Sequence, residues 1–265
     1  MIDLSSVDAG FSRKAKLYDD YCENHPVIRW ARDTVRQGVR SKLKTGDAIL
    51  ELNAGTGSDA AYFVANNYRV HATDFASGMV SAIKEKISIS EKKDQFTTQQ
   101  ISFTDLDYVI GAPFDLVFSN LGGLNCIPDL GMVTKFLSRL LKPGGHVVWV
   151  VMPPFCPWEL SLILRGKFRV AARRFNPNGV LANIEGVKVR TWYHSSKKVV
   201  EAFGSEFQLV KKQSLSLFCP PSYMDRFPHR FPNLTKILLH LDDRFGDRYP
   251  FHNWGDFVAY TFRYG

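Results

Sequence analysis

Short apolar runs that alternate with amphipathic ones over residues 45–152 constrain the fold more than any other feature of the sequence. The apolar runs predict five strands, at Ala48–Leu52, Arg69–Thr73, Phe96–Ser102, Phe114–Ser119 and His146–Met152. The last two runs are nearly continuously apolar, as central parallel strands are when both faces of their sheet are covered. A helix predicted over residues 130–141 ends at Lys142-Pro143-Gly144-Gly145, where proline and glycine stop it. This pattern predicts an α/β fold built on a mainly parallel sheet.

The second half of the chain predicts a cap, followed by the completion of the sheet. Prolines, aromatic residues and basic residues interrupt the alternation over residues 153–192, which favours a cap of loops and short helices inserted after the fifth strand. The elements predicted next are a helix over Ser195–Phe203 capped by Ser195 or Ser196, a strand at Phe207–Phe218, a short helix at Leu234–Leu241 and a strand at Asp256–Tyr264. We expect the last strand to pair antiparallel beside the fifth, in a seven-stranded mixed sheet with helices on both faces.

Length and composition exclude several classes of protein. With 265 residues, of which 45% are hydrophobic and 23% charged, the chain can bury a large core and is not disordered, collagen-like or a coiled coil. Its longest apolar stretch, near Val147–Phe155, is well short of the about 20 residues that a membrane-spanning helix needs. The N-terminal residues lack the apolar core of a secretory signal, so we expect a cytoplasmic location. The four cysteines lie far apart and predict neither a metal site nor a disulfide framework.

The charge of the chain is unevenly distributed. Residues 1–150 hold 17 Lys or Arg and 17 Asp or Glu, whereas residues 151–265 hold 17 and 9, so the whole net charge of +8 lies in the second part. Such an asymmetry indicates that the C-terminal part meets an acidic substrate, carrier or surface, although solvated basic faces are also common.

The strongest motif is Glu51-Leu52-Asn53-Ala54-Gly55-Thr56-Gly57-Ser58-Asp59-Ala60, which follows the first predicted strand and opens a predicted helix. Its glycines let the backbone turn sharply and approach a ligand closely. Taken alone, the motif also fits a dinucleotide-binding loop, with Asp74 as a ribose acceptor in either case. Three features favour a different family: Glu51 four residues before Gly55, the Pro-Gly-Gly turn before the fifth strand, and the strand pair at the end of the sequence.

With these motifs the sequence resembles the class I S-adenosylmethionine-dependent methyltransferases. The matching segments are ELNAGTGSDA, HATDFASGMV, FDLVFSNLGGLN and LLKPGGHVVWVV, which occur in the family's order over about Thr45–Met152. The resemblance is closest to the small-molecule branch that includes quinone methyltransferases, whose N-terminal helix commonly carries a Tyr-Asp pair, here Tyr18-Asp19. It implies a Rossmann-like sheet, methyltransferase activity and S-adenosyl-L-methionine as cofactor.

The resemblance also implies which residues contact the cofactor. They lie on the N-terminal helix, the glycine-rich loop and the ends of the second, third and fourth strands: Tyr18, Glu51, Asn53, Ala54, Gly55, Thr56, Gly57, Asp59, Asp74, Phe75, Met79, Ser102, Phe103, Asn120 and Leu121. Asp74 would accept both ribose hydroxyls, and Phe75 with Met79 would sandwich the adenine. Ser102 stands where the family often has an aspartate that receives the adenine amine.

Methyl transfer from a sulfonium is an in-line displacement, in which the enzyme mainly positions the acceptor. His194 is the candidate base if the acceptor must lose a proton. The cap holds five cations within ten residues, Arg165, Lys167, Arg169, Arg173 and Arg174, next to aromatic residues. We therefore predict a small-molecule, carrier-linked or lipid-linked acceptor that is anionic with an apolar portion. Its predicted contacts are Asn125, Trp158, Arg173, Arg174 and Tyr193.

The predicted organisation is one methyltransferase domain over residues 1–265. It divides into an N-terminal helical cover (1–44), a cofactor-binding half (45–152), a substrate cap (153–192) and the completion of the sheet (193–265). We expect no metal, no nucleic-acid partner and at most a surface association with membranes. Two alternatives stay open: an NAD(P)-dependent oxidoreductase, and a catalytically silent protein of the same fold that binds a partner.

Overall fold

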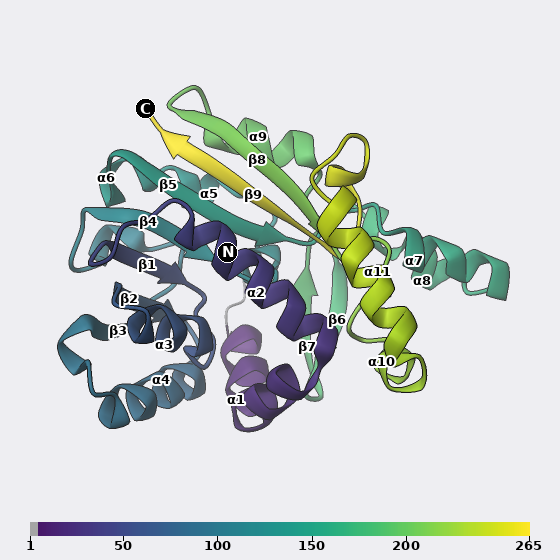
Figure 1. Cartoon of the computed structure of the whole chain (residues 1–265), viewed down its shortest axis with the longest axis horizontal. Helices are drawn as coiled ribbons and strands as arrows, with labels where there is room; N and C mark the ends of the chain where they lie inside the picture. Colours follow the sequence, from purple (N-terminus) through teal and green to yellow (C-terminus); the bar gives the residue numbers. More distant parts are fainter. Residues whose placement is uncertain (1–4) are drawn as a thin grey trace.

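The computed structural model describes residues 5–265 and arranges them around one seven-stranded sheet (Figure 1). Residues 1–4 of the predicted N-terminal cover lie outside the described residues. The strand order is β3-β2-β1-β4-β5-β9-β8. The bounds are β1 Ala48–Leu52, β2 Arg69–Asp74, β3 Phe96–Gln100, β4 Phe114–Ser119, β5 Leu141–Val151, β8 Phe207–Leu215 and β9 Phe257–Tyr264. β1 to β5 run parallel, and β9 lies antiparallel between β5 and β8, which confirms the predicted mixed sheet.

Helices bury both faces of this sheet. The longer ones are α1 Ser5–Asn24, α2 Pro26–Arg40, α3 Ser58–Ala65, α4 Ser77–Ile89, α9 Ser196–Phe203 and α11 Pro232–Phe245. On one face Trp149 and Phe262 pack against Phe203 of α9, and on the other Phe118 packs against Phe63 of α3. The predicted cap of α9 is confirmed, because the Ser195 hydroxyl accepts from the Lys198 amide at 3.3 Å. No helix in the part of the chain that the structure describes is long and apolar enough to cross a membrane.

The structure corrects the helix predicted over residues 130–141. It forms two single-turn helices, α5 Gly131–Thr134 and α6 Leu137–Leu140, because the amide of Phe136 bonds the carbonyl of Val133 three residues back. The Pro-Gly-Gly turn also falls inside the extent of β5, where the register against β4 shifts between Phe114 and Leu116. Proline cannot donate to the sheet, so an irregular pairing is expected there.

The cap contains a hairpin that the sequence did not predict. Short helices α7 Pro157–Leu160 and α8 Phe168–Ala172 come first, and β6 Val180–Ile184 then pairs antiparallel with β7 Val187–Thr191. Glu185 and Gly186 both have positive φ, 47° and 84°, as a two-residue hairpin turn requires. The hairpin packs against α1, where a Cβ on Gly10 would lie 3.3 Å from Val189.

A buried ionic cluster joins the cap to the sheet. Arg174, 3% exposed, donates to Glu159 Oε1 at 2.8 Å and to Asp256 Oδ1 at 2.6 Å. Its third nitrogen donates to the carbonyls of Pro153 and Asp256. The neighbouring Arg173 reaches both oxygens of Glu159 at 2.7 Å. Glu159 is on α7, and Asp256 precedes β9 and follows Glu159 by 97 residues, so this cluster joins distant segments of the chain.

We expect Arg174→Ala to lower the free energy of unfolding by about 3–5 kcal/mol, because it removes the arginine that pairs with the buried Asp256 and one of the two arginines that pair with Glu159. Denaturant unfolding followed by circular dichroism measures this change. Arg165→Ala, which removes an exposed arginine of the same cap, is the control and should change stability by less than about 0.5 kcal/mol. Equal stability of the two variants would contradict a structural role for the cluster.

Candidate functional site

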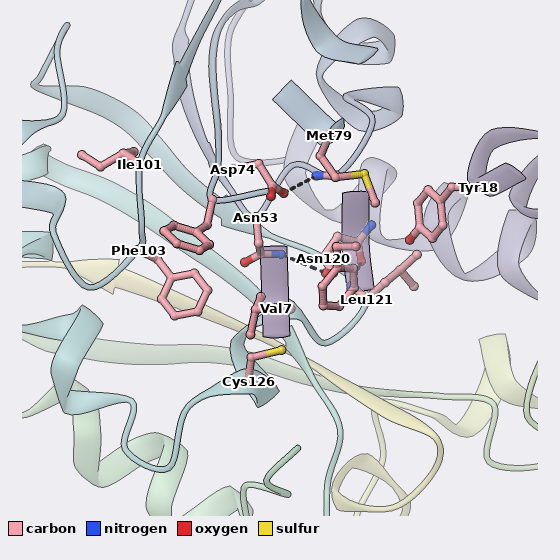
Figure 2. Close-up of a pocket in the computed structure, with 14 residues that line it drawn as sticks. Val7, Tyr18, Asn53, Asp74, Met79, Ile101, Phe103, Asn120, Leu121 and Cys126 are labelled. Atoms are coloured by element: carbon pink, nitrogen blue, oxygen red, sulfur yellow. Dashed lines mark hydrogen bonds between the residues drawn. The ribbon is translucent and has the colours of Figure 1, made fainter. Parts of the chain in front are cut away.

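A pocket of about 620 Å³ lies at the carboxyl ends of β1, β2 and β4 (Figure 2). Here the strand order reverses, since β2 and β3 lie on one side of β1 and β4 and β5 on the other. Ligands bind at this switch point in open α/β sheets. The residues that line the pocket are Val7, Phe11, Tyr18, Asn53, Gly55, Asp74, Phe75, Met79, Ile101, Phe103, Asn120, Leu121, Gly123 and Cys126.

The glycine-rich loop needs unusual backbone angles to pass over the end of β1. Asn53, Gly55 and Gly57 have φ of 46°, 59° and 77°. L side chains disfavour this region, and glycine enters it at little cost. A Cβ on Gly57 would also lie 3.0 Å from Ile83 of α4. The glycines therefore let the loop lie close against α4.

Asp74, the last residue of β2, holds this loop. Its Oδ2 accepts from the Gly55 amide at 2.8 Å, and its Oδ1 accepts from the Ala76 amide at 2.8 Å. Burial raises the pKa of Asp74 to about 6, although these backbone hydrogen bonds oppose the shift. Each carboxylate oxygen can accept more than one hydrogen bond, and the side chain borders the cavity (Figure 2).

A network of hydrogen bonds between polar side chains supports the side of the loop opposite Asp74. Asn53 accepts from the Ser119 hydroxyl at 2.8 Å, and Asn120 donates to Asp59 at 3.0 Å. Arg36 donates to the same Asp59 at 2.7 Å. Burial would raise the pKa of Asp59, but nearby arginines and Asn120 hold it below its ordinary value. These contacts fix the orientation of Asn53 and Asn120, which both face the pocket (Figure 2).

Glu51 is the buried polar group that this network leaves unsatisfied. It is 2% exposed on β1, and its Oε2 has no hydrogen-bond partner among the described residues. Burial and the charge of Asp59 raise the pKa of Glu51 well above its ordinary value. Since an unpaired buried carboxyl is costly, a partner from a bound molecule or water is expected beside the loop.

Helix α1 covers the pocket and is fixed by polar side chains. Asp19 accepts from Thr56, from Ser58 at 2.7 Å and from Lys86. Near the start of α1, Asp8 accepts from the Ser77 amide at 2.8 Å, in the first turn of α4. Tyr18 faces the cavity from the side opposite Phe103 (Figure 2). The predicted Tyr-Asp pair therefore lies at the pocket and the loop respectively.

The structure brings most of the predicted cofactor residues together. Tyr18, Asn53, Gly55, Asp74, Phe75, Met79, Phe103, Asn120 and Leu121 line the pocket. Glu51, Ala54, Thr56, Gly57, Asp59 and Ser102 do not line it. Most of these belong to the loop and its supports, and the hydroxyl of Ser102 instead contacts Thr104 at 2.7 Å.

Sequence reasoning missed five lining residues: Val7, Phe11, Ile101, Gly123 and Cys126. Val7 and Phe11 are four residues apart on α1, which is a spacing that could have signalled an apolar helix face. Ile101 adjoins the predicted Ser102 at the end of the third strand. Burial, and then the charge of Asp74, raise the pKa of the Cys126 thiol to about 12.

None of the predicted substrate residues lines this pocket. Asn125 is fully buried and bonds the backbone of Met152 and Trp192. Trp158 donates to the carbonyl of Leu217 at 3.0 Å, and Tyr193 lies 5.0 Å from the Arg174 guanidinium. The structure gives these side chains supporting contacts within the fold.

The two arginines and the histidine also differ from the expectation. Arg173 and Arg174 belong to the ionic cluster, where Glu159 and Asp256 take their donors. The basic segment from Arg165 to Arg174 contains no acid, which predicts free cations, but Glu159 and Asp256 from other segments pair with its last two arginines. His194 is 2% exposed, and burial lowers its pKa to about 4. Its Nε2 has no hydrogen-bond partner among the described residues.

Residues 49–145 match the family model described as a methyltransferase domain. This part of the chain belongs to the S-adenosylmethionine-dependent methyltransferases. The predicted class of enzyme, an S-adenosylmethionine-dependent methyltransferase, is therefore confirmed, and so is its predicted cofactor.

Three similar proteins illustrate the relationship. An uncharacterised protein of Methanocaldococcus jannaschii is 23% identical over 83% of this chain and 82% of its own length. The demethylmenaquinone methyltransferase of Halalkalibacterium halodurans is 30% identical over 50% of this chain and 56% of that enzyme. The chain thus spans about half the length of that enzyme. The fold is shared with 1,6-didemethyltoxoflavin-N1-methyltransferase of Burkholderia thailandensis, crystallised with S-adenosylhomocysteine, at a TM-score of 0.56 and 15% identity over 98% of this chain and 88% of that one.

The pocket fits the cofactor of this family. Asp74 offers carboxylate oxygens for hydroxyl donors, and Phe75 with Met79 offers apolar surface. The unpaired oxygen of Glu51 lies behind the lining and suits a water molecule that bridges to a ligand. The lining thus offers partners for a ribose and for an aromatic base.

We expect affinity for S-adenosylmethionine to fall as the pH drops below about 6. The pKa of Asp74 is raised to about 6, and the ionised carboxylate is the better acceptor for ribose hydroxyls. Below this pKa a proton must leave before the cofactor binds, so Kd should rise about tenfold per pH unit. Titration calorimetry between about pH 5 and 8 measures this, with Asp74→Asn as the control that should lose the dependence. A flat profile in the unaltered protein would show that the ribose does not bind Asp74.

Proposed function

We propose that this protein transfers the methyl group of S-adenosylmethionine directly to a small acceptor that has an apolar portion and is free or linked to a lipid or carrier. The observation that carries this proposal is a single pocket in which the Asp74 carboxylate lies beside a chamber lined largely by apolar side chains. The cofactor, when bound, supplies the activated methyl group. The work of the protein is then to hold donor and acceptor in line.

Each side chain has a role in this proposal. Asp74 accepts the ribose hydroxyls, and Phe75 and Met79 contact the adenine. Glu51 receives the ammonium end beside the loop, directly or through water. Tyr18 and α1 cover the site and exclude water. The four-part division of residues 1–265, with a substrate cap at 153–192, belongs to the same proposal.

The pocket lining favours an acceptor that is apolar and neutral over the anionic one expected from the sequence. Its residues include no Lys, Arg or His among those described, and Val7, Phe11 and Phe103 provide apolar surface. Arg173 and Arg174, on which the anionic acceptor rested, are paired with Glu159 and Asp256, and Arg174 is buried. Relatives named demethylmenaquinone methyltransferase and malonyl-[acyl-carrier protein] O-methyltransferase support an acceptor that is a quinone or is linked to a carrier.

The site also favours an acceptor that needs no protein base. His194 does not line the pocket. Burial raises the pKa values of Tyr18 and Cys126, so both stay protonated near neutral pH. Asp74 is already engaged by two amides. A neutral acceptor that can release its proton to water, such as a quinol, fits these conditions.

The test compares cofactors and then acceptors. We expect S-adenosylmethionine to bind in calorimetry and NADPH not to bind, with Asp74→Ala weakening the former about 10- to 150-fold, because a charge-assisted hydrogen bond contributes about 1.5–3 kcal/mol. Asp94→Ala, an exposed carboxylate, is the matched control. Transfer of labelled methyl groups is then measured on neutral phenols and quinols, anionic analogues and acyl-carrier conjugates. Binding of NADPH alone would favour an oxidoreductase, and cofactor binding with no transfer to any acceptor would favour a silent protein.

A further inference from the structure

The outer part of the cap exposes an unusual number of apolar side chains. We call residues 161–170 the cap tip; it runs from the end of α7 to the middle of α8. Leu164 is 90% exposed, Phe168 64%, Ile163 44% and Val170 38%. α7 and α8 project from one end of the molecule, away from the sheet (Figure 1). Within the described chain these side chains therefore cover no core.

The cap tip is also positively charged without compensation. Arg165, Lys167 and Arg169 are exposed and have no ion pair with a described carboxylate. No acid occurs in the sequence between Glu159 and Glu185. Glu159 itself is buried and neutralised by the cluster at the base of the cap. Three cations thus alternate with apolar side chains over a few residues.

We propose that the cap tip docks on the surface of a lipid bilayer that contains anionic lipids. Aliphatic and aromatic side chains that enter the boundary of the acyl chains, with cations at the level of the headgroups, are the combination that such surfaces bind. Single-stranded nucleic acid would also attract the cations, but its bases stack on aromatic rings, whereas Ile163, Leu164 and Val170 are aliphatic. The composition of the tip therefore favours lipid.

Contacts at the base of the cap fix the position of the cap tip relative to the sheet. The guanidinium of Arg174 ties the cap to the start of β9, and Trp158 of α7 bonds the carbonyl of Leu217. The cap follows the carboxyl end of β5, and the pocket lies at the carboxyl ends of the neighbouring strands. A bilayer bound at the cap tip would thus lie at the same end of the sheet as the pocket. Docking does not depend on the proposed methyl transfer, although it would bring the pocket near a lipid-linked acceptor.

The experiment measures binding of the full chain to vesicles of phosphatidylcholine, with and without phosphatidylglycerol, by co-sedimentation. We expect binding to the anionic vesicles that weakens with salt, and little binding to the neutral ones. The triple variant R165E/K167E/R169E should lower affinity at least about 100-fold, since each cation near such a surface contributes about fivefold. I163S/L164S/F168S should lower it at least about tenfold, through lost apolar burial.

Two triple variants elsewhere on the surface serve as matched controls. K44E/K84E/K93E changes the net charge by the same amount at exposed lysines, and I89S/Y108S/I110S removes exposed apolar side chains of similar size. Both should bind vesicles as the unaltered protein does. Circular dichroism and affinity for S-adenosylmethionine check that every variant is folded, independently of methyl transfer.

Three results would overturn the proposal: no binding to anionic vesicles, equal binding to neutral vesicles, or equal loss in the control variants. Preferential binding of the tip to single-stranded nucleic acid over anionic vesicles would also overturn it. Loss confined to the two cap-tip variants, with cofactor affinity unchanged, would support it even if no acceptor were found.

Discussion

The contact on which the site depends is the pair of hydrogen bonds from Gly55 and Ala76 to the Asp74 carboxylate. One side chain at the end of β2 thereby holds both the glycine-rich loop after β1 and the residue before α4. The loop then supports α1, because Thr56 and Ser58 donate to Asp19. The carboxylate that we propose to bind the cofactor therefore also holds the local structure together. Its burial is a condition of the fold and also the reason that its pKa lies near 6.

α1 and α4 meet closely enough to require a small residue. A Cβ on Gly78 would lie 2.8 Å from the Cα of Ser12, which real contacts do not allow. With glycine there, the Ser12 hydroxyl accepts from the Gly78 amide and Asp8 accepts from the Ser77 amide. Side chains of α1 thus satisfy the first turn of α4, whose own preceding residue is alanine and cannot cap it. The contacts that place α1 over the pocket therefore also cap α4.

Sequence patterns predicted the parts that depend on local chemistry. Apolar strands, turn glycines and the acid at the end of β2 follow from residues close together in the chain, and the structure places them as expected. The predictions differed where distant residues decide the outcome. Arg174 looked free because its run holds no acid, yet Asp256, 82 residues away, supplies one. Asn125 was predicted to contact the substrate, yet its side chain bonds the backbone of Met152 and Trp192.

Charge in the cap shows why position has to be known before charge is interpreted. Its five cations count equally in the sequence, but Arg174 holds the cap to the start of β9 and the partly exposed Arg173 pairs with Glu159, whereas Arg165, Lys167 and Arg169 face solvent. Burying Arg174 costs desolvation that its carboxylates must offset, so it cannot also bind an anionic ligand without leaving those acids unpaired. The exposed cations have no such commitment. An anionic partner of the cap is therefore expected at its outer end, and an apolar acceptor in the pocket.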